Sequence, residues 1–290
     1  MNEHSNTERT VERVKAAVIA MQPMPTMIRE VLDQIRDPNI EGAQLIETLR
    51  NDPGLTVNIL RVVNSPVYAS GSERVESLLQ AFVRLGARTV CRIVIAHGLA
   101  GQLAGRLPGY ELEPRALLQH AVGVALNAEA LASLLQKGSP DVLFTAGLLH
   151  DIGKVVLDPF ITEVRPELDQ MLAQNSTCTF DQMERQLLGV THAEAGAWLL
   201  RHWNVPGLPA MAAEMHHDPE SAPATMREDV LVIHLADTLV YAQGVGDGID
   251  GLRYRAHGNA AAALGLRTRD LESIAGQTWE KVREWSALLS

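Results

Sequence analysis

Residues 142–154 read Val-Leu-Phe-Thr-Ala-Gly-Leu-Leu-His-Asp-Ile-Gly-Lys, an apolar run that ends in ionisable side chains. The apolar part, residues 142–149, predicts a buried helix, and the pair His150 and Asp151 follows it directly. A buried carboxylate is costly unless it is paired, hydrogen-bonded or bound to a metal ion. An imidazole nitrogen and carboxylate oxygens offered from one turn of chain suit a divalent metal ion. The doublet therefore predicts a metal site inside a helical protein.

The overall composition is that of a folded protein rather than a disordered one, because 46% of the 290 residues are hydrophobic and 21% are charged. A formal net charge of −10 argues against non-specific nucleic-acid binding, which needs clustered Lys and Arg side chains. No stretch approaches the roughly 20 apolar residues of a membrane span, and polar residues 1–13 do not resemble a secretory signal. Cys91 and Cys178 are too few for a disulfide framework and are expected to be free thiols. We therefore expect a cytoplasmic protein without a nucleic-acid or membrane partner.

Helical patterns dominate the chain. Only 4% of the residues are aromatic, Ala and Leu are abundant and strand-type alternation is scarce, so we expect an all-α fold. Capping boxes at Thr191–Glu194 and Thr225–Glu228 predict two helix starts, and the second of these helices is expected to reach about Gln243. Proline and glycine breaks delimit the other expected helices, at residues 8–21, 26–35, 41–51, 54–64, 76–85, 89–103, 116–135, 142–149, 209–217 and 271–289.

A domain boundary is expected between Arg106 and Pro114, where two prolines and a glycine interrupt the helical pattern. We expect an N-terminal helical bundle at residues 1–105, built from short helices with proline stops. The second domain, residues 106–290, contains the candidate site residues.

Seven side chains are candidates for one metal centre because they lie on otherwise apolar helix faces or at helix ends: His120, His150, Asp151, His192, His216, His217 and Asp237. Imidazoles with carboxylates suit one or two divalent transition-metal ions, Fe, Mn, Zn or Ni rather than Ca. With two ions about 3.5–4 Å apart, Asp151 would bridge them and a water molecule would be activated for attack on phosphorus. Lys154, one turn after the doublet, would neutralise a phosphate oxygen. Asp151 and Lys154 are therefore the candidate catalytic residues.

Each candidate also has a purely structural interpretation when it is taken alone. His120 on an apolar face is typical of a core histidine with one hydrogen bond, and His192 is typical of a residue in a first helical turn. The pair His216-His217 ends a helix, where the dipole favours a positive charge. Asp237 on an apolar face is explained only if an Arg or Lys side chain pairs with it. These interpretations are not independent, and the His-Asp doublet favours a shared site.

The candidates belong to a longer set of motifs, which are, in chain order, Met24-Pro25, Asn51-Asp52-Pro53-Gly54-Leu55, Leu60-Arg61-Val62-Val63-Asn64-Ser65, Leu85-Gly86, His120, the octapeptide from Gly147 to Lys154, His192-x-x-x-Gly196, Trp203-x-x-Pro206, His216-His217-x-Pro219 and Leu235-Ala236-Asp237. Over roughly residues 18–242 this ordered set resembles the HDOD domain, the HD-related output domain of bacterial signalling proteins. The order of His120, His150-Asp151 and Asp237 resembles the wider HD superfamily of metal-dependent phosphohydrolases.

The resemblance implies an N-terminal helical bundle packed on an HD-like helical bundle, in a family often without demonstrated catalysis. The related HD-GYP phosphodiesterases cleave cyclic di-GMP at a site with two or three metal ions. Similarity to them implies two ligand sets that share one carboxylate, the first being His120, His150, Asp151 and Asp237 and the second being Asp151, His192, His216 and His217. The chain departs from these relatives at Ala116, where trimetal members carry an acidic ligand, and after His217, where no Gly-Tyr-Pro motif follows. These departures argue against cyclic di-GMP hydrolysis.

Two functions from different classes fit the sequence. The first is a signal-transduction module that retains the metal site and acts through contacts with an unidentified signalling partner protein. The alternative is a metal-dependent phosphohydrolase or phosphodiesterase acting on a nucleotide or cyclic dinucleotide. The complete ligand set supports this alternative. A phosphate-containing ligand is a candidate under both hypotheses. Metal content together with a hydrolysis screen separates them.

Overall fold

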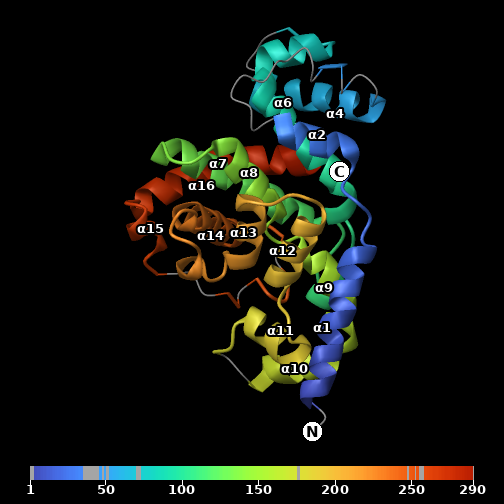
Figure 1. Cartoon of the computed structure of the whole chain (residues 1–290). Coiled ribbons are helices and arrows are strands. Elements are labelled where there is room, and N and C mark those ends of the chain that lie inside the picture. Colours follow the sequence, from blue (N-terminus) through green and yellow to red (C-terminus); the bar gives the residue numbers. More distant parts are fainter. Residues whose placement is uncertain are drawn as a thin grey trace.

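The computed structural model describes residues 3–34, 46–47, 49, 52–69, 73–174, 177–246, 248–251, 253–254 and 258–289. All continuous elements of secondary structure in these residues are helices. Within these residues the β-type pairing is a single isolated bridge between Leu107 and Leu112. The predicted all-α fold is therefore confirmed. The helices are α1 (Glu3–Ala20), α2 (Thr26–Gln34), α4 (Pro53–Val63), α5 (Pro66–Ala69), α6 (Leu78–Leu103), η1 (Pro108–Tyr110), α7 (Ala116–Leu135), α8 (Pro140–Leu149), α9 (Gly153–Glu163), α10 (Arg165–Gln174), α11 (Phe180–Leu188), α12 (His192–His202), α13 (Leu208–Met215), η2 (Pro219–Ser221), α14 (Arg227–Ala242), α15 (Ala260–Ala263) and α16 (Thr268–Leu288) (Figure 1).

The N-terminal helices α2, α4 and the first part of α6 lie together at the top of the molecule in Figure 1. Asp52 caps α4 by accepting from the backbone N–H of Leu55, and Pro53 occupies the first helical turn. Residues 76–85 and 89–103 were expected to form two helices separated at Gly86, and α6 does leave helical geometry at Gly86, with φ 78° and ψ 155°, so it consists of two helical stretches joined by a kink. Most of the expected helix at residues 41–51 lies outside the described residues.

Helix α7 packs against α8, α14 and α16, and α12 packs against α13, α9 and α1. One buried apolar cluster extends through both halves of the chain and includes Ile59 of α4, Phe144 of α8 and Trp285 of α16. The rings of Phe144 and Trp285 are 5.7 Å apart, edge to face. This apolar core is continuous across residues 106–114. The domain boundary expected there stays a prediction.

A buried ion-pair cluster fastens α6 to the central bundle. Asp141 at the start of α8 is 1% exposed, and its Oδ1 lies 2.6 Å from Nη2 of Arg92. Arg88 also pairs with Asp141, and Arg92 pairs with Glu129 of α7. Because these carboxylates and guanidinium groups satisfy one another, the charges are tolerated next to the core.

Two capping boxes were predicted, and the structure contains one of them. Thr191 accepts from the N–H of Glu194, whose carboxylate accepts in return from the N–H of Thr191. The prediction of a capping box at Thr225 is wrong. Helix α14 begins only at Arg227, because a turn closed by a hydrogen bond to the carbonyl of Pro223 precedes it. Glu228 instead pairs with Lys137, 3.0 Å away. The helices α9, α10 and α11 were not anticipated.

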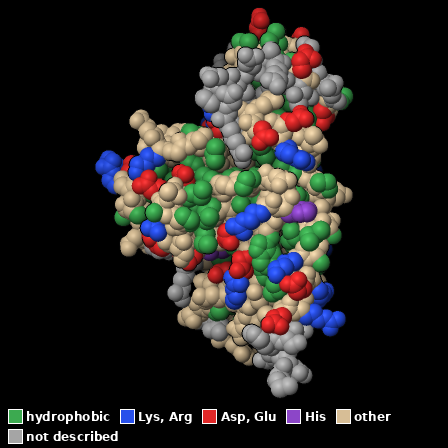
Figure 2. Space-filling model, in the orientation of Figure 1, with side chains coloured by type: hydrophobic (Ala, Val, Ile, Leu, Met, Phe, Trp, Pro, Cys, Tyr) green, Lys and Arg blue, Asp and Glu red, His purple; other side chains and the backbone are tan. Residues whose placement is uncertain are grey.

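The surface in Figure 2 carries Lys and Arg side chains interspersed with Asp and Glu, and the described part of this face has no continuous basic patch. Among the described residues, no helix has both the length and the apolar character needed to cross a membrane.

Helix α9 begins at Gly153, shortly after the His150-Asp151 doublet, and at this residue its backbone lies very close to that of α12. A Cβ atom at Gly153 would lie 1.9 Å from the carbonyl oxygen of His192 and 2.5 Å from the backbone nitrogen of Gly196. Both obstacles are backbone atoms, so a larger residue would force the helices apart. Gly153 is therefore required for the packing of α9 against α12.

We expect Gly153→Ala to lower the free energy of unfolding by about 1–3 kcal/mol, the usual cost of overpacking, in urea denaturation of the metal-free chain. The control is Gly276→Ala in α16, where no atom lies within 4 Å of the added Cβ. That change should leave stability unaltered or raise it by about 0.5–1 kcal/mol, because alanine is the better helix former. Equal stabilities for Gly153→Ala and the unchanged chain would contradict the packing argument.

Candidate metal centre

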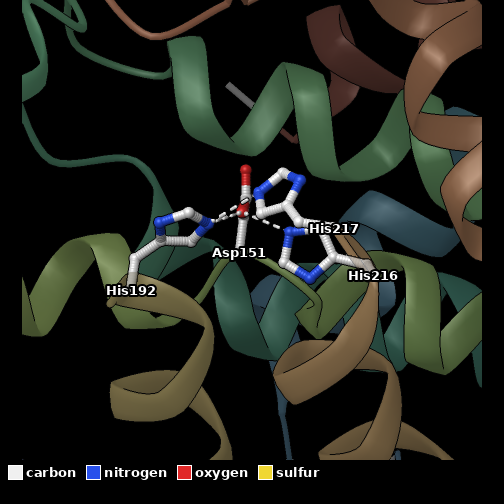
Figure 3. Close-up of side chains that lie close together, drawn as sticks. All are labelled: Asp151, His192, His216 and His217. Carbon is white, nitrogen blue, oxygen red and sulfur yellow. Dashed lines mark hydrogen bonds and ion pairs between the residues drawn. The ribbon is translucent and has the colours of Figure 1, made fainter. Parts of the chain in front are cut away.

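The seven candidate ligands come from five regions of the chain and meet inside the central bundle. His120 lies on α7, His150 and Asp151 follow α8, His192 begins α12, the pair His216-His217 follows α13, and Asp237 lies on α14. Six of the side chains are between 0% and 5% exposed, and His217 is half-buried. Figure 3 shows Asp151 facing the rings of the second ligand set.

The carboxylate of Asp151 lies between two groups of histidines. Its Oδ2 is 3.4 Å from Nε2 of His150 and 3.8 Å from Nε2 of His120. Its Oδ1 is 3.4 Å from Nε2 of His192 and 3.5 Å from Nε2 of His216. These separations match roughly 3.4 Å edges between ligand atoms held about 2.1 Å from a tetrahedral metal ion.

The remaining two candidates complete the two groups. Oδ1 of Asp237 is 2.9 Å from Nε2 of His120 and 3.7 Å from Nε2 of His150. Nε2 of His217 lies 3.0 Å from Nε2 of His192. Each group can therefore hold one ion: Asp151, His192, His216 and His217 offer ligand atoms within 4.8 Å of one another, as do His120, His150 and Asp151.

The ring orientation of these histidines is set through Nδ1. His150 Nδ1 lies 2.7 Å from the carbonyl oxygen of Gly147, and His216 Nδ1 lies 2.9 Å from that of Ala213. A carbonyl oxygen only accepts, so both rings carry a proton on Nδ1, and Nε2 is the atom left to bind a metal ion. His192 Nδ1 is 2.8 Å from the carboxylate of Glu184, which also accepts from the His192 backbone N–H.

Polar atoms at the middle of the cluster are left without hydrogen bonds. Nε2 of His120, His150 and His216 and Oδ1 of Asp237 are buried and make no hydrogen bond of acceptable angle, although His120 Nε2 and Asp237 Oδ1 are 2.9 Å apart. Buried polar atoms without partners are rare and costly, and several of them converging on one place need an explanation. Divalent metal ions bound by imidazole Nε2 and carboxylate oxygen provide it, so the residues fit a metal centre.

The electrostatics favour charged carboxylates and neutral rings at His216 and His217, as metal ligands need, but favour the protonated ring at His150. Burial alone would raise the carboxyl pKa of Asp151 and Asp237, but neighbouring histidines, with Lys154 beside Asp151, hold both values well below the usual range. Burial lowers the pKa of His216, and burial with the charge of His216 lowers that of His217 further. For His150 burial also acts downward, but Asp151 and Asp237 outweigh it and raise the pKa to about 10.

Lys154 lies differently from its expected position beside a bound phosphate. Its side chain is 2% exposed, and its Nζ is 2.6 Å from a carboxylate oxygen of Asp151 and 2.6 Å from one of Asp250. Burial acts to lower its pKa, but the two carboxylates outweigh burial and raise it. The charge of Lys154 is therefore neutralised by two buried carboxylates. Contact with a phosphate requires one of these ion pairs to break.

Two residues of the centre were missed from the sequence. Glu184 is fully buried on α11 and binds His192 and the hydroxyl of Tyr110, which donates over 2.6 Å. Its only sequence signal was a charged residue on an apolar helix face, in a region not expected to be helical. Asp250 lies in the glycine-rich stretch after α14, where no local spacing marks it as a partner of Lys154.

Comparison with known proteins places the fold in a group of solved structures. A Geobacter sulfurreducens HDOD domain protein of unknown function is 22% identical, with a TM-score of 0.74 over 96% of this chain and 98% of that one. A Shewanella amazonensis SB2B protein, provisionally assigned as a phosphohydrolase, is 22% identical, with a TM-score of 0.73 over the same shares of the two chains. Identities this low show a shared fold.

The sequence comparisons extend beyond solved structures. An uncharacterized protein of Treponema pallidum (strain Nichols) is 24% identical over 223 residues, which are 75% of this chain but only 41% of that relative. The family model of the HDOD domain matches residues 21–219, more than half of the sequence. It ends before Asp237, which lies near the end of the longer resemblance predicted above. On this match the chain belongs to the HDOD domain family.

Proposed function

We propose that this chain is a regulatory HDOD module that binds one or two divalent transition-metal ions and signals through contact with a partner protein. The observation that carries the metal site is the set of buried Nε2 atoms without hydrogen bonds, beside rings whose Nδ1 atoms are already engaged. This arrangement supports a pre-oriented ligand set rather than a group of core histidines.

The ligand assignment follows the two groups around Asp151. His120, His150 and Asp237 would complete one site, and the second would be completed by His192, His216 and His217. Imidazole and carboxylate donors suit Fe, Mn, Zn or Ni. When bound, such ions supply Lewis acidity toward a phosphoryl oxygen. The chain itself orients the rings, keeps the carboxylates charged and excludes bulk water.

Burial supports the regulatory function over catalysis. The ligand side chains other than His217 are at most 5% exposed, and the Lys154 charge is taken up by Asp151 and Asp250. A nucleotide would need both a route to the centre and a free cation. The alternative, a metal-dependent phosphohydrolase or phosphodiesterase, is supported by one observation, the placement of both Asp151 oxygens between two histidine groups.

The deciding experiment measures metal content and turnover on the same preparation. The purified chain, loaded anaerobically with Fe(II), Mn(II), Zn(II) or Ni(II), is expected to retain metal and to leave nucleotides and cyclic dinucleotides intact. Asp151→Asn should reduce bound metal by at least about tenfold, because it removes the shared ligand. Asp158→Asn is the matched control, since Asp158 is a buried carboxylate outside the centre that accepts from the N–H of Gly109.

The outcomes separate the alternatives. Turnover that disappears in Asp151→Asn, with an unchanged circular dichroism spectrum, would establish the hydrolase and reject the purely regulatory module. Failure of the unchanged chain to bind any of the four metals would refute the proposed centre altogether.

A second prediction concerns Glu184, which orients His192 through Nδ1. Glu184→Gln keeps the size of the side chain but removes the charge that increases the basicity of the ring. We expect metal affinity to fall about 10–100-fold, the usual effect of losing such an outer partner. Glu194→Gln, at the partly exposed capping box of the same helix, should leave metal affinity unchanged. Equal affinities for Glu184→Gln and the unchanged chain would contradict the orienting role.

The third prediction is a pH dependence of metal affinity. The metal-free His150, with its pKa raised to about 10, is protonated at neutral pH and must lose that proton to become a ligand. Binding therefore releases protons, and affinity should rise about tenfold per pH unit between about pH 6 and 8 for each proton released. Competition titrations with a metal indicator at several pH values measure the slope. A metal affinity that does not change with pH would show that metal binding does not remove a proton from His150.

A further inference from the structure

A short segment after α14 covers the half-buried edge of the centre. We call its described residues, Gly248–Gly251, Arg253 and Tyr254, the strap. The Tyr254 ring stacks on the His217 ring, with centroids 3.9 Å apart and an interplanar angle of 11°. The strap therefore lies directly on the one candidate ligand that is not fully buried.

The strap is joined to the centre by a buried chain of charges. Asp250 is 1% exposed, and its Oδ2 lies 2.6 Å from Nζ of Lys154, which in turn is 2.6 Å from Asp151. The Tyr254 hydroxyl donates to the same Asp250 oxygen over 3.0 Å. Asp250 thus connects the residue that covers His217 with the cation beside the shared ligand.

Outside this chain of charges, the strap is held by a few hydrogen bonds to three other regions. The Ile249 N–H donates to the Tyr110 carbonyl over 3.0 Å, and the Arg253 carbonyl accepts from the Phe180 N–H over 3.3 Å. The Arg253 guanidinium donates to the Leu172 carbonyl. None of these contacts involves a candidate ligand. Ile249 and Tyr254 also pack against the apolar core. Among the described residues, the strap contacts the candidate ligands and Lys154 through Asp250 and the Tyr254 ring.

The charge at Lys154 determines what can replace Asp250. The ammonium lies over the rings of Tyr110 and Tyr254, 5.9 Å and 5.6 Å from their centroids, so two aromatic rings flank it in addition to the two carboxylates. Metal ions bound at Asp151 would add positive charge to this buried region. A group that takes the place of Asp250 must then be an anion.

We propose that Asp250 is an internal counter-anion that keeps the strap closed, and that a phosphate-type anion opens it by replacing Asp250 at Lys154. This inference rests on the proposed function in that it names the ligand class and the regulation of the same centre. The family match ends at residue 219, so Asp250 and Tyr254 lie outside it, whereas their partners Lys154 and His217 lie inside it. Ligand entry and strap movement are one event, and a displaced strap presents a changed surface to a signalling partner.

The test uses the full-length, Mn(II)-loaded chain and inorganic phosphate as the probe, with affinity measured by calorimetry. Asp250→Asn should bind phosphate at least tenfold more tightly, because the competing carboxylate is gone. Glu228→Gln is the matched control, since Glu228 is an exposed carboxylate paired with Lys137, remote from the centre. It should bind phosphate as the unchanged chain does. Saturating phosphate should also speed hydrogen exchange of the Ile249 and Gly251 amides in the unchanged chain.

Two readouts keep the test decisive. If Asp250→Asn does not fold, Tyr254→Phe keeps the stack on His217, loses only the bond to Asp250, and should shift phosphate affinity in the same direction by a smaller factor. Unchanged phosphate affinity in a folded, metal-loaded variant would overturn the strap proposal while leaving the metal centre intact. If no metal binds, the proposed function fails, and phosphate binding to the metal-free variants still decides whether Asp250 competes at Lys154.

Discussion

The position of one carboxylate, that of Asp151, governs the arrangement of the whole centre. Each of its oxygens faces a different pair of imidazoles, so four helices and the turn after α8 must converge on it. That convergence depends on backbone packing as much as on the ligands. The turn after α8 leads into α9, and α9 reaches α12 only because Gly153 has no side chain. The same octapeptide that supplies the ligands therefore also supplies the close approach that places His192 opposite them.

Helix ends explain how so many imidazoles reach one point. His150 follows the last turn of α8 and His216 that of α13, where backbone carbonyls are not used by the helix. Each ring bonds one of these carbonyls through Nδ1 and turns Nε2 inward. The carbonyl of His216 in turn lies 2.7 Å from Nδ1 of His234 on α14. The rings are thus held by main-chain atoms, and their direction is fixed before any metal binds.

The sequence predicted what is encoded locally and failed where the contacts are long-range. The bounds of the helix at residues 116–135 were predicted correctly, because breakers flank a continuous apolar pattern. The candidate ligands were recognisable from the ordered motifs. Asp250 was missed because its partner Lys154 is distant in the chain and no local spacing encodes a buried ion pair. The Thr225 box failed for a related reason, since Glu228 pairs with Lys137, which lies just after the end of α7.

The buried row of Asp151, Lys154 and Asp250 bears on why the centre is retained. Three charges in the interior contribute little net stability, because the cost of removing them from water offsets much of their attraction. Apolar residues of similar size would stabilise the fold at least as well. Lys154 neutralises Asp151 without occupying the Nε2 atoms around it, and Asp250 neutralises Lys154 from a segment outside the family match. A row of charges that is costly to bury, joins the candidate ligands to the strap and leaves the imidazole Nε2 atoms without hydrogen bonds is better explained by regulation than by stability.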